Sequence, residues 1–201
     1  VNCHFVWNDA GDGLIVDPGA DAEYILNGLR ERGIRLRGVL LTHGHVDHIG
    51  ALPEVVEAND VPVLLHEADH ALYHSPANAL PPWLPAVKDL PQLGCVPNDL
   101  DGLAFEMQHT PGHTQGGASY HFGDGACLFC GDTLFNGSVG RTDLPGGDED
   151  QLMRSIGEVL FALPPETRVF PGHGPATTIG TEAVHNPYCA KMARFRSSRV
   201  K

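Results

Sequence analysis

Residues 39–48 have the sequence Val-Leu-Leu-Thr-His-Gly-His-Val-Asp-His. Its three apolar residues predict a short buried strand, and the polar residues follow where that strand ends. His43 and His45 are two apart in an extended segment, so both side chains leave the backbone on one side and can share one ion. Asp47 and His48 follow where the chain turns into a helix, and they can face a second point nearby. The stretch therefore predicts a metal-binding loop between a strand and a helix.

Three later segments share one character: a single ligand-type side chain next to glycine at the end of a predicted strand. His113 lies in Thr-Pro-Gly-His-Thr, Asp132 in Cys-Gly-Asp-Thr and His173 in Phe-Pro-Gly-His-Gly. Imidazole suits zinc, iron and related ions, and a carboxylate can bridge two of them. Seven histidines lack this setting, and we interpret them as surface or hydrogen-bonded residues: His4, His66, His70, His74, His109, His121 and His185. Three of these, His66, His70 and His74, are four residues apart, which would place them on one exposed helix face.

Length and composition predict one globular domain over residues 1–201, with 42% hydrophobic and 19% charged residues. The net charge of -12 disfavours binding to a phosphate backbone, so no nucleic-acid partner is expected. No apolar run reaches the roughly 18 to 20 residues of a membrane span, so no membrane partner is expected either. Five cysteines cannot all pair, and reduced thiols are typical of the cytoplasm. Cys127 and Cys130 fall in a predicted strand, where residues three apart point to opposite faces and cannot hold one ion.

The pattern of apolar and turn residues mixes strands with helices, which predicts an α/β or α+β fold. Helices are expected over residues 21–32, 50–58 and 148–162. Strands are expected over residues 3–8, 13–16, 39–41, 61–65, 103–109, 117–122, 126–130 and 169–170. Residues 76–97 hold six prolines around Trp83, and we expect a long irregular surface loop there, with a linker between domains as the alternative.

With these motifs the sequence resembles the metallo-β-lactamase superfamily, along essentially the whole chain. The residues that carry the resemblance are, in order, Asp17, His43, His45, Asp47, His48, His113, Asp132 and His173. The segments that begin at Gly131, Phe170 and His185 are most similar to the glyoxalase-II-like (hydroxyacylglutathione hydrolase-like) branch. The resemblance implies a four-layer αββα sandwich.

The resemblance also implies two divalent metal ions, of which Zn²⁺ is expected and Fe or Mn are alternatives. His43, His45 and His113 would hold the first ion, and Asp47, His48 and His173 the second, with Asp132 bridging both. Asp17 is similar to a family aspartate that supports the ligand loop, although a turn residue in Asp-Pro-Gly is an equal alternative.

The activity implied is a metal-dependent hydrolase, a thioesterase of glyoxalase II type that acts on an S-lactoylglutathione-like thioester. A hydroxide between the two ions would attack the thioester or ester carbonyl of a small molecule, and Asp47 is the expected catalytic residue. Arg141 lies just past the Asp132 loop, where it either binds an anionic substrate group or forms a structural ion pair. The sequence predicts neither the exact substrate nor the oligomeric state.

Three alternatives stay open. A persulfide dioxygenase is similar in Gly140-Arg-Thr-Asp and would use one iron held by His43, His113 and Asp132. A lactonase would use the same seven ligands, and an inactive metal-binding protein is the third alternative. Asp132 disfavours a β-lactamase, and His45 disfavours an oxygen reductase of the flavodiiron type.

Overall fold

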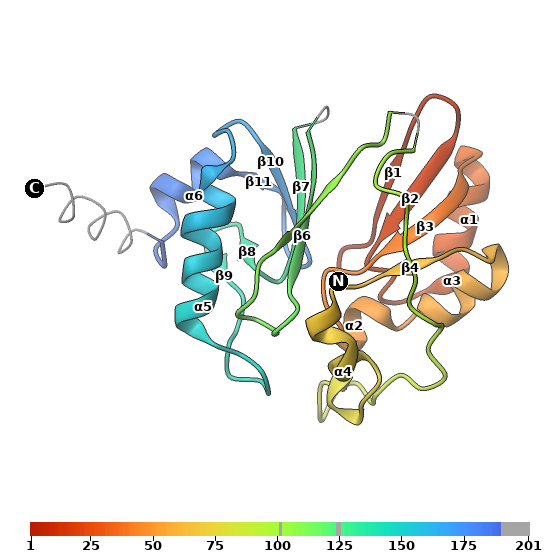
Figure 1. The fold of residues 1–201 in the computed structure, drawn as a ribbon, viewed down its shortest axis with the longest axis horizontal. Helices are drawn as coiled ribbons and strands as arrows, with labels where there is room; N and C mark the ends of the chain where they lie inside the picture. The colour runs from red at the N-terminus through yellow and green to blue at the C-terminus, as the bar shows by residue number, and fades with distance from the viewer. Residues whose placement is uncertain (101, 124–125, 190–201) are drawn as a thin grey trace, which may run out of the picture. The chain divides into compact units, whose positions relative to one another are not determined.

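The computed structural model describes residues 1–100, 102–123 and 126–189. The chain divides into two compact units, Val1–Glu106 and Met107–Lys201, and each is built on a sheet with helices (Figure 1). The single-domain assignment for residues 1–201 therefore stays a prediction. No helix in the described part of the chain is long and apolar enough to cross a membrane.

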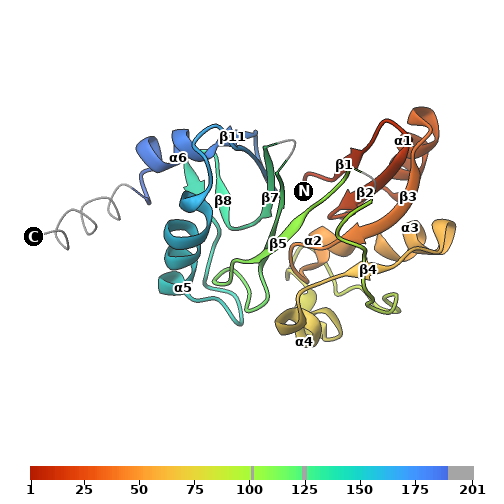
Figure 2. The same ribbon diagram turned by 45° about the horizontal axis from the view of Figure 1, so that its top comes forward.

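The sheet of the first unit has four strands in the order of the sequence. They are β1 (His4–Trp7), β2 (Asp12–Val16), β3 (Arg35–Leu40) and β4 (Val63–Leu64). The first pair is antiparallel, and β2, β3 and β4 are parallel. Two helices, α1 (Ala22–Arg32) and α3 (Leu52–Asn59), lie against the sheet (Figures 1 and 2), and Ile25, Leu29, Leu52 and Val55 join the strand residues in one apolar core. The carboxyl end of β2 leads into the loop before α1, and that of β3 leads into residues 41–45, which precede α2 (Val46–Ile49) and α3.

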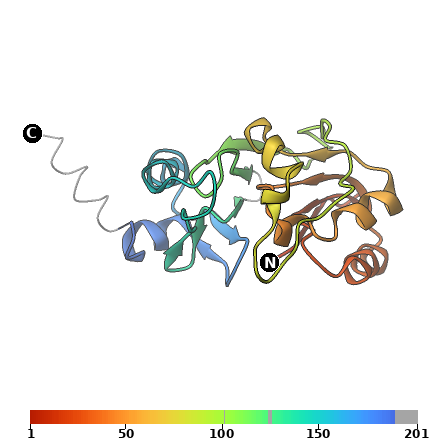
Figure 3. The same cartoon turned by 90° about the horizontal axis from the view of Figure 1, so that it is seen from below.

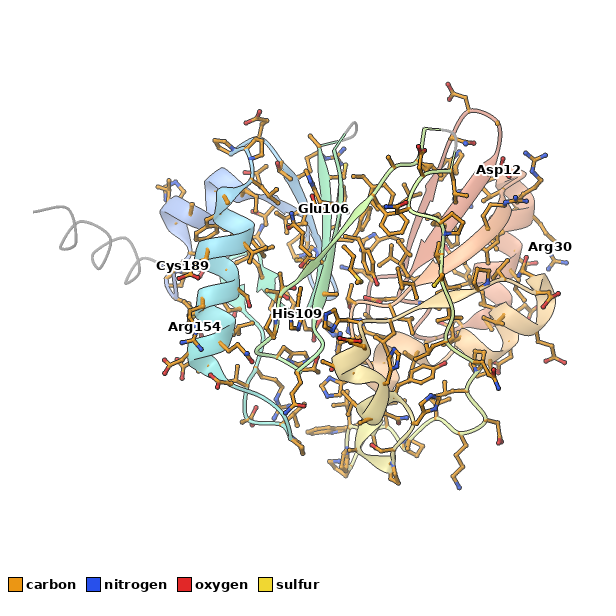
Figure 4. All side chains as sticks on the ribbon, viewed as in Figure 1. Asp12, Arg30, Glu106, His109, Arg154 and Cys189 are labelled. Carbon is orange, nitrogen blue, oxygen red and sulfur yellow. The ribbon has the colours of Figure 1, made fainter. Side chains whose placement is uncertain are left out.

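The first helix follows its sequence closely. Ile25 and Leu29 are buried, while Arg30 is exposed and points away from the sheet (Figure 4). Gly33 ends α1 in the left-handed conformation, φ 65°, and its N–H bonds to the carbonyl of Arg30, as the glycine stop predicts. The predicted helix over residues 21–32 is thus confirmed.

The second unit has a five-stranded sheet in the order β11-β10-β7-β6-β5. Its strands are β5 (Glu106–His109), β6 (Ala118–Phe122), β7 (Cys127–Gly131), β10 (Arg168–Pro171) and β11 (Thr177–Thr178). The hairpin β8 (Leu134–Phe135) and β9 (Ser138–Val139) forms a separate small sheet, and α6 (Ile179–His185) follows β11. The sequence did not predict this hairpin, β11 or α6.

The long helical run of the second unit begins at Glu149, where the side chain of Asp148 accepts the N–H of Gln151. The run continues from α5 (Glu149–Arg154) through one wider turn, Ser155–Val159, and one tighter turn, Leu160–Ala162. Figure 3 shows this run, in teal, nearly end-on. Leu152, Ile156 and Leu160 are fully buried and pack in one core with Leu128 and Val169 of the sheet. A helical segment over residues 148–162 is therefore confirmed, although only its first part is an α-helix.

The proline-rich segment 76–97 is irregular, as predicted, with one short helical turn at Pro76–Asn78. It is nevertheless held in place, because the buried side chain of Asn78 bonds the carbonyl of Tyr73 and both backbone groups of Val87. The shared helix face expected for His66, His70 and His74 is wrong. Helix α4 covers only His70–Tyr73, and the ring of His66 instead accepts the N–H of Ala68 at the start of a short helical turn.

The five cysteines are all free thiols, and their burial predicts different reactivities. Burial raises the pKa of Cys3 and of Cys189 to about 12, so very little of either thiol is the reactive thiolate at pH 8. Cys95 is exposed. We expect iodoacetamide at pH 8 to modify Cys95 in the native protein and to spare Cys3 and Cys189, as measured by mass spectrometry. Unfolded chain, labelled at all five positions, is the control, and rapid native labelling of Cys3 or Cys189 would contradict the expected burial.

Candidate metal centre

The ligand loop of the first unit starts where β3 leaves the sheet. The N–H of Leu41 still bonds to the carbonyl of Leu64 on the neighbouring strand. The loop then runs through His43 and His45 into α2 (Val46–Ile49), and the N–H of His48 closes the first turn on the carbonyl of His45. The predicted strand, loop and helix around residues 39–48 are therefore present.

The four predicted ligands of this unit lie close together. The ring centroids of His43 and His45 are 4.8 Å apart, and those of His43 and His48 are 4.0 Å apart. A carboxylate oxygen of Asp47 lies 3.8 Å from Nε2 of His48. The three imidazoles are buried, and the Asp47 side chain is 17% exposed. Nitrogen and carboxylate donors at these separations suit a transition-metal ion such as zinc or iron.

Asp17 holds this ligand loop through three hydrogen bonds. Its Oδ1 accepts the N–H of Thr42 at 2.8 Å. Its Oδ2 accepts the Thr42 hydroxyl at 2.7 Å and faces Nδ1 of His48 at 2.8 Å. The aspartate is 2% exposed and adopts φ 53°, a left-handed conformation that aspartate and asparagine tolerate. Of the two roles open for Asp17, the structure shows support of the ligand loop.

These contacts determine which ring nitrogens carry protons. A carboxylate accepts, so Nδ1 of His48 carries a proton, and in the neutral ring Nε2 then has the lone pair. The Thr42 hydroxyl donates to Asp17, so its oxygen accepts from Nδ1 of His43 at 3.1 Å. Asp17 therefore favours the proton on Nδ1 of His48, and through Thr42 also on Nδ1 of His43, which is the tautomer in which Nε2 can bind a metal ion.

Replacing Asp17 with asparagine is expected to weaken metal binding about 10- to 100-fold, as loss of such supporting contacts typically does. In either orientation of the asparagine amide its NH₂ group faces a donor, which is the N–H of Thr42 in one orientation and Nδ1 of His48 in the other. The variant therefore either loses the bond that holds the loop backbone or favours the other tautomer of His48. The affinity is measured by competition with a chelator. Asp89→Asn is the matched control, because Asp89 has φ 54° and is exposed. Unchanged affinity in Asp17→Asn would contradict the proposed direction of the ring nitrogens.

The second unit brings together the other three predicted ligands. Oδ2 of Asp132 lies 3.8 Å from Nε2 of His113 and 3.6 Å from Nε2 of His173. Nδ1 of His113 bonds at 2.7 Å to the carbonyl of Arg141, which can only accept, so Nε2 of His113 again keeps its lone pair. A carboxylate that faces two imidazoles suits a shared ligand. The combination of all seven residues into one centre stays a prediction.

The side chain of Arg141 makes two hydrogen bonds to Asp143, at 2.7 and 2.8 Å. This pairing lowers the pKa of Asp143 to about 2, chiefly through the guanidinium hydrogen bond. Both side chains are more than half exposed. The ion-pair alternative for Arg141 is therefore present, and its substrate-binding role stays a prediction.

Sequence reasoning missed two residues that hold the ligand loop, Thr42 and Asp69. The hydroxyl of Thr42 lies between Asp17 and His43, and Oδ2 of Asp69 accepts the N–H of Gly44 at 3.0 Å. Thr42 stands directly before the first histidine, which is a usable indication. Asp69 lies 25 residues after Gly44 in an unremarkable segment, so the sequence carries no sign of the contact.

The sequence has relatives of similar length. A sequence model described as the metallo-beta-lactamase superfamily matches residues 1–173. The probable metallo-hydrolase YqgX of Bacillus subtilis is 39% identical over 93% of this chain and 91% of its own. The hydroxyacylglutathione hydrolase GloC of Haemophilus influenzae is 38% identical over 93% of this chain and 92% of its own.

Three solved structures are similar to this chain over most of its length. The BLEG-1 B3 metallo-β-lactamase superposes with a TM-score of 0.84 at 39% identity, covering 94% of this chain and 93% of that one. TTHA1623 in a di-iron-bound form gives 0.83 at 41% identity, covering 93% and 94%. ETHE1 from Myxococcus xanthus gives 0.72 at 30% identity, covering 94% and 79%. The predicted mixed α/β fold, matching an αββα sandwich, is confirmed. The chain belongs to the metallo-β-lactamase superfamily and is a metallo-hydrolase of that family.

Proposed function

We propose that this metallo-hydrolase is a thioesterase of glyoxalase II type with a dinuclear centre. In this proposal His43, His45 and His113 hold one ion, Asp47, His48 and His173 hold the other, and Asp132 bridges them. The donor chemistry supports it, because the contacts of three imidazoles favour the proton on Nδ1, the tautomer that binds a metal through Nε2, and because Asp132 faces two histidines. The di-iron-bound TTHA1623 structure supports two ions and keeps iron beside zinc as a candidate.

The protein's own part in the reaction is to hold the ligands and exclude alternative protonation states. Two bound divalent ions would lower the pKa of a water molecule to near neutral and polarise the substrate carbonyl. Asp17, Thr42 and the carbonyl of Arg141 keep the ring protons on Nδ1, so no ligand tautomerisation accompanies turnover. Asp47 has a partly exposed carboxylate and is the group we assign to orient the reacting water.

The observation that carries the substrate class is the 38% identity to the hydroxyacylglutathione hydrolase GloC along nearly the full length of both chains. A thioester such as S-lactoylglutathione is therefore the proposed substrate. We expect metal-loaded protein to hydrolyse S-lactoylglutathione and apoprotein to be inactive. A β-lactam is the comparison substrate, because BLEG-1 is named a B3 metallo-β-lactamase. Hydrolysis of the β-lactam without thioester hydrolysis would contradict the proposed substrate class.

A second candidate is a persulfide dioxygenase with one iron, and the similarity to ETHE1 is compatible with it. The two candidates differ in what they consume. A dioxygenase takes up oxygen with glutathione persulfide, whereas a thioesterase releases a thiol and takes up none. Oxygen-electrode measurements on the iron-loaded protein distinguish them, and persulfide-dependent oxygen uptake without thioester hydrolysis would replace the thioesterase proposal with this one.

A further inference from the structure

The backbone of the ligand loop is held by side chains where the sheet no longer reaches it. The N–H of Val39 bonds to the carbonyl of Pro62, and that of Leu41 to the carbonyl of Leu64. Beyond this point the acceptors change. The N–H of Thr42 bonds to the carboxylate of Asp17, and the N–H of Gly44 to the carboxylate of Asp69. Two buried carboxylates thus accept the backbone N–H groups of the loop where the neighbouring strand no longer supplies carbonyl acceptors.

Asp69 occupies a helix N-cap position, where an aspartate side chain usually accepts a backbone N–H of the helix. It is the N-cap residue of α4, yet its side chain makes no capping hydrogen bond to that helix. Its side chain bonds instead to Gly44, and the residue is 1% exposed. Burial strengthens a hydrogen bond from an amide to a carboxylate, since no water competes for it.

Helix α4, which begins directly after Asp69, is held in place by hydrogen bonds to the segment that follows it. The hydroxyl of Tyr73 on α4 donates to the carbonyl of Pro91 at 2.8 Å, and Asn78 donates to the carbonyl of Tyr73. The loop also approaches α4 closely, because a Cβ placed on Gly44 would lie 3.2 Å from the backbone nitrogen of Tyr73. Asp69 therefore connects the ligand loop to a packed helix, not to a mobile surface.

The amide of Gly44 belongs to the peptide that joins it to His43, so fixing this amide restricts ψ of His43. That torsion is one of the backbone angles that set the path of the chain from His43 to His45, and with it the relative directions of their Cα–Cβ bonds. The two rings lie at 88° to each other with a centroid separation of 4.8 Å. We infer that Asp69 is a positioning residue that makes the imidazoles of His43 and His45 converge on one ion. This inference rests on the proposed dinuclear centre.

The test is metal affinity in apoprotein reloaded with Zn²⁺ against a competing chelator. The competition gives one affinity for each ion. The His45→Ala variant shows which of the two belongs to the ion held by His43 and His45, because only that affinity is expected to fall strongly. We expect Asp69→Ala to weaken that ion about 10- to 100-fold and to leave the other ion within about threefold of wild type. Asp69→Asn keeps an acceptor oxygen without the charge, so we expect a loss smaller than about tenfold. Asp9→Ala, at an exposed aspartate of the same unit, is the control.

If Asp69 only stabilised the fold, the measurements on Asp69→Ala would give a different result. Asp69→Ala would then lower the thermal midpoint of the apoprotein while both ions bound as in wild type, and this result would overturn the inference. Should Asp69→Ala fail to fold, Asp69→Ser takes its place, because serine also removes the carboxylate. The expected loss of affinity and the contradicting result are then the same as for Asp69→Ala. The wild-type ion count tests the dinuclear proposal separately. A wild type with one ion contradicts that proposal, while the ratio of affinities between wild type and the Asp69 variants still tests the role of Asp69.

Discussion

Substitution of Asp132 by alanine is expected to lower kcat for thioester hydrolysis about a thousandfold and to reduce the number of bound metal ions. Its carboxylate lies between the Nε2 atoms of His113 and His173, at 3.8 and 3.6 Å. A carboxylate that bridges two ions also brings negative charge that offsets part of their repulsion. Loss of metal-based stabilisation of the transition state is worth several kcal/mol, and about 4 kcal/mol corresponds to a thousandfold.

The matched control is Asp150→Ala, which removes an exposed carboxylate on the first turn of α5 in the same unit. We expect it to keep wild-type kcat and metal content. Steady-state kinetics and elemental analysis are made on the same preparations of both variants. Full activity and two ions in Asp132→Ala would refute the bridging role.

Substitution of Gly19 by alanine is expected to destabilise the protein by about 3 kcal/mol and to displace Asp47. A Cβ at Gly19 would lie 1.7 Å from the carbonyl oxygen of Asp47, far inside van der Waals contact. Gly50 packs against the same turn, since a Cβ placed on Gly50 would lie 2.3 Å from the carbonyl oxygen of Gly19. The Asp17-Pro-Gly turn and α2 thus pack backbone against backbone, and no side-chain rotation relieves an added methyl group.

Gly94→Ala is the control for this prediction, because its Cβ would have only an ordinary contact, 3.7 Å from Cβ of Pro62. Urea unfolding of both apoproteins measures the free energy of unfolding, and chelator competition measures metal affinity. We expect Gly19→Ala to lower both the free energy of unfolding and the metal affinity, and Gly94→Ala to leave both at wild-type values. Wild-type stability in Gly19→Ala would show that the turn and α2 do not pack as described.

Several parts of the fold followed from local sequence, because local forces determine them. The apolar spacing of Ile25 and Leu29, with Gly33 after them, predicts α1 and its end. The ligand loop could be recognised because strand, histidines and helix are consecutive. The predicted ligands after β5, β7 and β10 were identified by the recurring glycine beside a strand end.

The elements that sequence reasoning missed depend on contacts between distant residues. Helix α6 is only seven residues long and contains a glycine, and it is anchored by the buried carboxylate of Glu182. That carboxylate accepts the N–H of Gly137, the hydroxyl of Thr177 and the side-chain amide of Asn186. The same network holds the β8–β9 hairpin, whose strands are only two residues long. Neither element has a local pattern strong enough to predict it.

The supporting residues of the candidate site were the hardest to foresee, for the same reason. Asp17 was recognised only by resemblance, with a simple turn as an equal alternative, until its three contacts to Thr42 and His48 were seen. Asp69 is the last residue of a short helical turn, directly before α4, and would be taken for a helix cap. Only the three-dimensional fold brings its carboxylate to Gly44.

Elemental analysis of the purified, metal-reconstituted protein tests the central claim most directly. The claim is that the chain uses seven side chains to bind two divalent ions. The account predicts two ions per chain, falling to one or none in Asp132→Ala. A wild-type protein saturated with a single ion, and an unchanged count in Asp132→Ala, would contradict it.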